Sequence, residues 1–195
     1  MFAIGKSLTG RAVDRAACLE SDTVKKMATV PLVSVEEYLH TSYRPDCDYI
    51  DGVVVERNLG RFDHSTMQML VLMALQSRAN EWRVLVRPEL RLRIRPGKYR
   101  VPDVMVLPAV VKHPPVIELP PLLCIEIVSP DDRLKDLIER AKDYRSLRVP
   151  ETWILDPEEK RAYVYAAGLR QVESKSAMLI RGDIELDFAA LCAQL

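Results

Sequence analysis

The chain has little glycine and no long apolar run, and it lacks the motifs of several common enzyme classes. Only 7 of its 195 residues are glycine, and none forms G-x-G or G-x-x-x-x-G-K, which excludes dinucleotide-binding and P-loop phosphate sites. Neither a G-x-S-x-G nucleophile pattern nor an H-E-x-x-H zinc pattern occurs. No apolar stretch approaches the ~20 residues of a membrane-spanning helix, so we expect no membrane association.

Cysteine is also scarce, and its spacing argues against a zinc site built on thiolates. None of the four cysteines forms a C-x-x-C pair. Cys124 lies in an apolar run and is expected to be a buried free thiol. The N-terminus has no apolar run of the kind found in signal peptides, so we expect a cytoplasmic location.

The length suits a single folded domain. Residues 1–28 are rich in small and polar residues and show no clear period. We expect a flexible N-terminal extension there, with a short helix over 11–19 as the alternative. Residues 29–195 carry stronger signals and are expected to form the domain.

Helix signals recur along this region. Ser34 and Glu37 form a capping box that begins a short helix. Asp63 is expected to cap a longer helix that runs to about residue 81, and Asp131 or Asp132 to cap a third that runs to about residue 147. The segment that follows Asp63 has apolar residues at helical spacing, which indicates one buried face.

Strand signals lie between these helices. Asp51-Gly52 predicts a hairpin turn between two extended runs. Residues 121–128 are apolar nearly throughout, which is typical of a central strand covered on both faces. The order of elements predicts an α/β fold, a mixed β-sheet flanked by helices. Further strands are predicted over 84–86, 90–94, 100–107, 151–155, 161–165 and 178–180, with a short terminal segment over 188–191.

The formal net charge is zero, with 28 basic and 28 acidic residues, which argues against a protein that coats nucleic acid through bulk charge. The distribution is uneven, however: residues 61–100 hold nine basic and three acidic side chains, a net of +6. Arg91, Arg93 and Arg95 alternate with apolar residues, so a strand would place them on one face, where they could contact phosphates. The alternative is an edge strand kept soluble by its charges.

Two acidic residues lie in unusually apolar surroundings. Asp103 follows Pro102 inside the run 101–107, and Glu126 is embedded in 122–128. A buried carboxylate is costly unless it is paired. A divalent metal is one such partner, which would also activate water against a phosphodiester. The alternative is that each carboxylate pairs with an arginine such as Arg93 or Arg100.

Several segments together resemble the Uma-type family of bacterial endonucleases. They are 49–56, His64, 101–104, 120–130 with its apolar-Glu-apolar-x-Ser-Pro pattern, and 149–157 with its Val-Pro-Glu-x-Trp-x-x-Asp-Pro pattern. Residues 27–31 also look like a start of such proteins, and the resemblance covers about 27–195.

This resemblance implies a restriction-endonuclease-like core of the PD-(D/E)XK type that cuts DNA with Mg²⁺ or Mn²⁺. Asp103, Glu126 and the backbone carbonyl of Ile127 would be the metal ligands. Asp48 matches an acidic position of the family and could face the metal, as could Glu56, with a surface carboxylate as the alternative for each. His64 matches a family histidine, with a structural role as the alternative.

The sequence departs from the nuclease pattern at the catalytic cation. The third motif position is Val128 rather than lysine. Similar proteins often carry lysine on the next helix, in a D-x-x-x-K-x-x-x-Y pattern, and that position is Arg140 here, with Lys142 half a turn away. Arginine stabilises phosphate charge but is a poor proton shuttle. Tyr144, which ends the pattern, and Trp153 are expected to be core aromatics.

Three functions therefore stay open. The first is a metal-dependent DNA endonuclease, which could act as a homodimer because duplex cleavage needs two cuts. The second is a degenerate nuclease fold that binds DNA or a protein without cutting. The third is a hydrolase of another phosphodiester.

Overall fold

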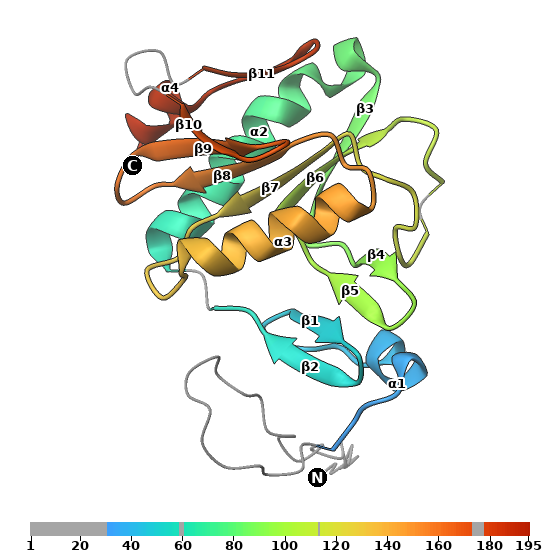
Figure 1. Ribbon diagram of the computed structural model, residues 1–195. Helices are drawn as coiled ribbons and strands as arrows, with labels where there is room; N and C mark the ends of the chain where they lie inside the picture. Colours follow the sequence, from blue (N-terminus) through green and yellow to red (C-terminus); the bar gives the residue numbers. More distant parts are fainter. Residues whose placement is uncertain (1–30, 59–60, 113, 173–177) are drawn as a thin grey trace, which may run out of the picture.

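The computed structural model describes residues 31–58, 61–112, 114–172 and 178–195. The predicted N-terminal extension and its alternative helix over 11–19 lie outside the described residues. Figure 1 shows a larger sheet flanked by helices, with a smaller sheet beside it. Among the described residues, no helix is both long enough and apolar enough to cross a membrane.

The larger sheet has the strand order β10-β9-β8-β7-β6-β3. Only β7 and β8 pair in parallel, and the chain between them forms helix α3 (Leu134–Ser146). The other neighbours pair antiparallel, so the sheet is mixed, as predicted. Its strands are β3 (Val84–Pro88), β6 (Val104–Pro108), β7 (Leu123–Ile127), β8 (Thr152–Asp156), β9 (Arg161–Tyr165) and β10 (Leu169–Val172).

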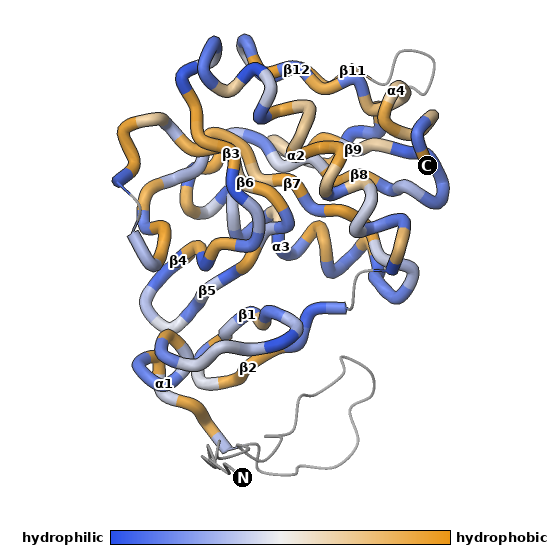
Figure 2. The backbone as a smooth tube through the Cα atoms, turned by 180° about the vertical axis from the view of Figure 1, so that it is seen from behind, coloured by the Kyte–Doolittle hydropathy of each residue, from blue (hydrophilic) through white to orange (hydrophobic). Residues whose placement is uncertain are grey.

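Both faces of the central strands are buried. In β6, Val104 and Val106 belong to the main core, whereas Met105 and Leu107 belong to a second core on the opposite face. This alternation follows from the two-residue period of a strand, and it confirms that the apolar run around Cys124 is covered on both sides. Figure 2 shows hydrophobic residues running through these strands. The main core is completed by α2 (Phe62–Trp82), β11 (Met178–Arg181), β12 (Ile184–Asp187) and α4 (Phe188–Cys192).

The smaller sheet has the order β2-β1-β5-β4. Its strands are β1 (Cys47–Ile50), β2 (Val53–Glu56), β4 (Leu92–Arg95) and β5 (Lys98–Arg100), and α1 (Val35–His40) packs beside them. Tyr38, Tyr49 and Tyr99 form its buried aromatic core. The hairpin turn is confirmed, since Asp51 and Gly52 both have positive φ angles of 48° and 95°. The Ser34 cap is confirmed too, because its hydroxyl accepts from the Glu37 N–H at 3.0 Å.

Several predicted boundaries are wrong. The predicted strand 100–107 is two strands, β5 and β6, separated at Val101-Pro102-Asp103, where Pro102 has no N–H for a strand ladder. Asp63 does not cap α2, whose N-cap position is Arg61 without a side-chain bond. The third helix begins only at Leu134.

Candidate active site

The two embedded acids meet across neighbouring strands. Val104 of β6 pairs with Ile125 of β7, so the same antiparallel register places Asp103, just before β6, opposite Glu126. Their exposed fractions are 1% and 0%. Glu126 points to the face covered by α3, on the same side of β7 as Cys124. The break at Pro102 therefore leaves Asp103 at the strand end but still beside Glu126.

Asp103 is held by three donors. Its Oδ2 accepts a hydrogen bond from the Ile127 N–H at 2.7 Å and lies 3.5 Å from His64 Nε2. Its Oδ1 pairs with the guanidinium of Arg57. Burial alone would raise the pKa of Asp103, but Arg57, His64 and the Ile127 N–H together hold that pKa well below its usual range. These partners therefore favour the ionised form of Asp103.

Glu126 has a different environment. The Tyr144 hydroxyl donates to its Oε1, and Arg140 Nη1 lies 3.1 Å from its Oε2. Burial raises the pKa of Glu126; Arg140 opposes this rise and the nearby charge of Asp103 adds to it. Tyr144 is a core aromatic as predicted, with 0% exposure, and its hydroxyl also positions this acid.

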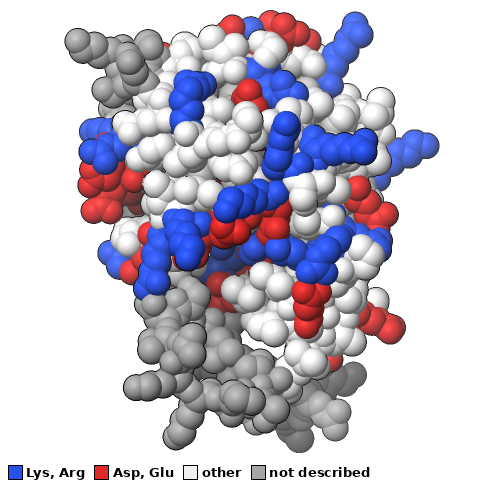
Figure 3. Space-filling view, in the orientation of Figure 1, with Lys and Arg blue, Asp and Glu red and all other residues white. Residues whose placement is uncertain are grey.

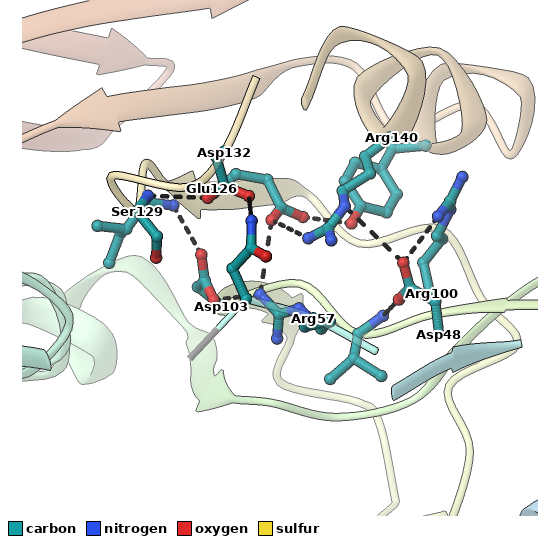
Figure 4. A network of polar contacts seen from close by, with 12 residues as sticks. Asp48, Arg57, Arg100, Asp103, Glu126, Ser129, Asp132 and Arg140 are labelled. Carbon is teal, nitrogen blue, oxygen red and sulfur yellow. Dashed lines mark hydrogen bonds and ion pairs between the residues drawn. The ribbon is translucent and has the colours of Figure 1, made fainter. Parts of the chain in front are cut away.

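Arg57 links the two acids. Its Nη2 contacts Asp103 Oδ1 and lies 3.7 Å from Glu126 Oε2. The side chain follows the end of β2, yet only 10% of it is exposed. Figure 4 shows the guanidinium between the two carboxylates. Both acids thus share one cation, which is the arrangement expected for acids that share a metal ion. The two acids therefore pair with arginines, which is the alternative that the sequence left open. Their partners are Arg57 and Arg140 rather than Arg93 or Arg100.

Asp48 is connected to this pair of acids through Arg140. Its Oδ2 binds Arg100 Nη1 at 2.7 Å and lies 3.8 Å from Arg140 Nε, and its Oδ1 accepts from the Val101 N–H at 2.9 Å. Burial would raise the pKa of Asp48, but Arg140 and Arg100 outweigh burial and lower it. Arg140 therefore bridges Asp48 and Glu126. The structure brings Asp48 into the network through arginines, without direct contact to Asp103.

The network continues to the surface of α3. Arg100 Nη2 binds Asp143 Oδ2 at 2.7 Å, and Lys98 Nζ binds Asp143 Oδ1 at 2.6 Å. Figure 3 shows basic and acidic side chains gathered in a band across this face, over α3. Acids and cations alternate along this network, so its charges are compensated.

Lys142 and Glu56 lie away from the two acids. The Lys142 side chain is 52% exposed and binds Glu139 at 2.6 Å, and Glu56 is exposed on the edge strand β2. Of the two candidate cations on α3, the structure thus brings only Arg140 to Glu126.

Each of the three β4-region arginines has a partner within the chain. Arg91 donates to the carbonyls of Leu39 and Thr41 at 2.8 and 2.7 Å. Arg93 binds Glu118 at 2.7 Å, and Arg95 binds Asp51 at 2.7 Å. The register shifts between Arg93 and Arg95, so the strand does not carry the regular stripe that the alternation predicts.

A cavity of about 120 Å³ opens beside Asp103. Arg57 and His64 line it, and neither Arg57 Nε nor His64 Nδ1 has a hydrogen-bond partner in the described part of the chain. The remaining lining residues are Pro45, Asp46, Asn58, Ser65, Gln68, Glu89 and Asp103. The site thus has open space next to Asp103 and Arg57.

The donor set fits a hard divalent cation. Asp103 and Glu126 offer carboxylate oxygens that already converge on one cation, and Mg²⁺ binds through one or two carboxylates with water. The N–H and C=O of one strand residue point toward the same neighbouring strand, so the Ile127 carbonyl faces the side of Asp103. Within the described ranges, no group of three or more His, Cys, Asp or Glu side chains could hold a metal, so water and the backbone must complete any coordination.

A mixed sheet flanked by helices, with paired acids on adjacent central strands, defines a restriction-endonuclease-like fold. The chain belongs to the Uma2 family, described as "Putative restriction endonuclease", whose model matches residues 35–188. The predicted family and fold class are therefore confirmed.

Two solved structures are similar to parts of this chain. One, described as "a putative nuclease belonging to DUF820" from Anabaena variabilis, has 20% identity and a TM-score of 0.71, and the match covers 83% of this chain and 98% of that one. A second is a DrdV–DNA complex, with 14% identity, a TM-score of 0.39, and coverage of 65% and 11%. No curated protein matches the chain.

Sequence patterns did not predict that Arg57 belongs to the site or that the Tyr144 hydroxyl binds Glu126. Tyr144 lies four residues after Arg140, so one helix face presents both to Glu126, and this spacing was visible in the sequence. Arg57 had no comparable signal, because its approach depends on how the smaller sheet packs against the larger one.

Proposed function

We propose that this protein is a metal-dependent nuclease that hydrolyses phosphodiester bonds in DNA. The observation that carries the proposal is the convergence of Asp103 and Glu126, from adjacent buried strands, on one cationic position. Membership of a family described as "Putative restriction endonuclease" supports the reaction class.

Asp103, Glu126 and the Ile127 carbonyl would hold Mg²⁺ or Mn²⁺. When bound, the metal would activate a water molecule and neutralise charge on the phosphate. The chain's own residues keep the ligands in position: the Ile127 N–H and His64 orient Asp103, and Tyr144 and Arg140 orient Glu126.

Of the two candidate cations on α3, Arg140 is the better placed to stabilise charge in this site. It is 13% exposed and 3.1 Å from Glu126, whereas Lys142 is turned toward solvent. Because a guanidinium keeps its proton, Arg140 acts through charge and hydrogen bonding. DNA is favoured as substrate by the net charge of +6 over residues 61–100.

A second function has its own support. Arg57 and Arg140 already neutralise both acids, and the sequence has no lysine at either family position. This arrangement favours a fold that binds DNA or a protein partner without cutting.

The test is cleavage of supercoiled plasmid with Mg²⁺ or Mn²⁺ by the wild type and by Asp103→Asn. Loss of one metal-binding carboxylate should reduce the rate by at least about 100-fold, since such a metal contributes several kcal/mol to the transition state. Arg78→Gln, which alters an exposed arginine paired with Glu81 and Glu185, is the control and should keep full activity. Cleavage that survives Asp103→Asn contradicts the proposed site, and DNA binding without cleavage by the wild type favours the second function.

A further inference from the structure

Arg57 occupies the position between the two acids that a metal would need. Its Nη2 touches Asp103 and lies 3.7 Å from Glu126. The guanidinium is thus already the shared cation of the site. Not all of its N–H groups are hydrogen-bonded: Arg57 Nε is buried without a hydrogen-bond partner among the described residues.

The charges around the site balance without a metal. The connected network contains four carboxylates, on Asp48, Asp103, Glu126 and Asp143, and four cations, on Arg57, Lys98, Arg100 and Arg140. A divalent ion added to this set would leave two uncompensated positive charges in a buried region, which is costly. Withdrawal of one cation when a metal enters would reduce this excess from two positive charges to one.

Arg57 is the cation whose withdrawal the geometry favours. Arg140 and Arg100 are each tied to Asp48, and Arg100 also to Asp143. Arg57 instead reaches in from the end of β2 and lines the cavity of about 120 Å³. That cavity gives its guanidinium room to turn away, toward the face where Asn58 and His64 lie.

We propose that Arg57 is a built-in competitor for the metal position: it bridges Asp103 and Glu126 in the resting site and must be displaced for a metal to bind. This inference rests on the proposed metal site. The exchange breaks no covalent bond; two ion pairs of Arg57 are replaced by two carboxylate–metal bonds. Arg57 thereby lowers the affinity of this protein for divalent metal.

The experiment is calorimetric titration of Mn²⁺ into the wild type, Arg57→Gln and Arg78→Gln. Breaking a buried ion pair leaves its partner charge uncompensated, which is strongly unfavourable, so Arg57→Gln should bind Mn²⁺ at least about tenfold more tightly than the wild type. Arg78→Gln is the matched control, because Arg78 also bridges two carboxylates but lies on the surface. Its Mn²⁺ affinity should equal that of the wild type.

Thermal unfolding gives a second readout. In EDTA, Arg57→Gln should melt below the wild type, because two buried acids lose their shared cation. Mn²⁺ should then raise the melting temperature of Arg57→Gln more than that of the wild type. If Arg57→Gln does not fold in EDTA, Arg57→Lys replaces it, because lysine keeps one charge without the bridging fork. Arg57→Lys should then bind Mn²⁺ more tightly than the wild type, and equal or weaker binding overturns the inference.

Unchanged or weaker Mn²⁺ binding by Arg57→Gln overturns the inference. So does tight binding that persists in the double variant Arg57→Gln with Asp103→Asn, because the metal would then bind elsewhere. If the wild type binds Mn²⁺ and cleaves DNA but Arg57→Gln gains no affinity, this inference fails and the nuclease proposal stands. If neither the wild type nor any variant binds Mn²⁺, both fail.

Discussion

Asp103 and Glu126 carry opposite pKa shifts although they are neighbours. Both are fully buried, so burial raises both pKa values, and the difference comes from their partners. Asp103 meets Arg57, His64 and a backbone N–H, whereas Glu126 also feels the charge of Asp103. Splitting the pKa values of two adjacent acids is typical of functional sites.

Asp48 gives a stability prediction at this scale. Asp48→Asn should lower the free energy of unfolding by roughly 3 kcal/mol at neutral pH, because Arg100 and Arg140 lose the buried charge that they share and Arg100 keeps only Asp143. The folded-state pKa of Asp48 is lowered, so its contribution is present above the unfolded pKa of about 3.9 and disappears as the pH falls through the folded pKa. Urea unfolding between pH 3 and 7 measures this. If Asp48→Asn lowered the free energy of unfolding by the same amount at pH 3 and at pH 7, the role assigned to the Asp48 charge would be contradicted.

The two central acids could be predicted from the sequence because each interrupts an apolar run, and a buried carboxylate needs a reason. Their cationic partners could not. Arg93 and Arg100 are nearer to Asp103 in sequence, yet Arg57 reaches the acids from another sheet. Long-range pairing of this kind depends on packing rather than on local spacing.

At the scale of elements, Arg91 links β4 to α1. It donates to two carbonyls at the end of α1 and stacks over Tyr38, with the guanidinium carbon 4.6 Å from the ring centre. The last carbonyls of a helix have no partner within the helix, so Arg91 satisfies groups that would otherwise be exposed to solvent or left unpaired. Arg91, one of the arginines predicted to contact DNA, thus holds α1 against β4.

Arg91→Ala should therefore destabilise the protein by about 1–3 kcal/mol, the usual range for losing hydrogen bonds to a charged group. Arg93→Ala is the control; it removes only an ion pair with the exposed Glu118 and should change stability by less than about 1 kcal/mol. Chemical denaturation of both variants measures this difference. Equal effects would mean that Arg91 does not anchor α1.

Element types were more predictable than element ends. The hairpin at Asp51-Gly52 and strand β9 follow local rules, and both match the structure. Strands β10 and β12 were missed, and β10 is short, with three of its four residues exposed. Such a strand forms because β9 offers an open edge, which the sequence of β10 alone does not reveal.

At the scale of the whole molecule, zero net charge conceals a basic segment. The net +6 over residues 61–100 is offset by acidity elsewhere, and much of the charge near the acids is compensated internally. Bulk attraction to DNA should therefore be weak, and binding should depend on a few local contacts. Of the three arginines predicted to contact DNA, Arg93 and Arg95 are the exposed ones, and the acid that pairs with each is also exposed.

The salt dependence of DNA binding tests this view. In an Asp103→Asn background, in which we expect little or no cleavage, changing Arg93 and Arg95 to alanine should weaken binding. It should also reduce the slope of log K against log salt by about 2, since each phosphate contact contributes about 0.9. Fluorescence anisotropy with a short duplex at several salt concentrations gives the slope. An unchanged slope would remove these arginines from the DNA interface.

The central claim is that Asp103 and Glu126 share one divalent metal, and a crystal structure with Mn²⁺ tests it most directly. Anomalous scattering identifies the ion without reference to activity. We predict an anomalous peak within roughly 2.0–2.6 Å of a carboxylate oxygen of each acid, with the Arg57 guanidinium turned away from both. A Mn²⁺-saturated crystal in which Arg57 still bridges the two acids, with no peak between them, would contradict the account.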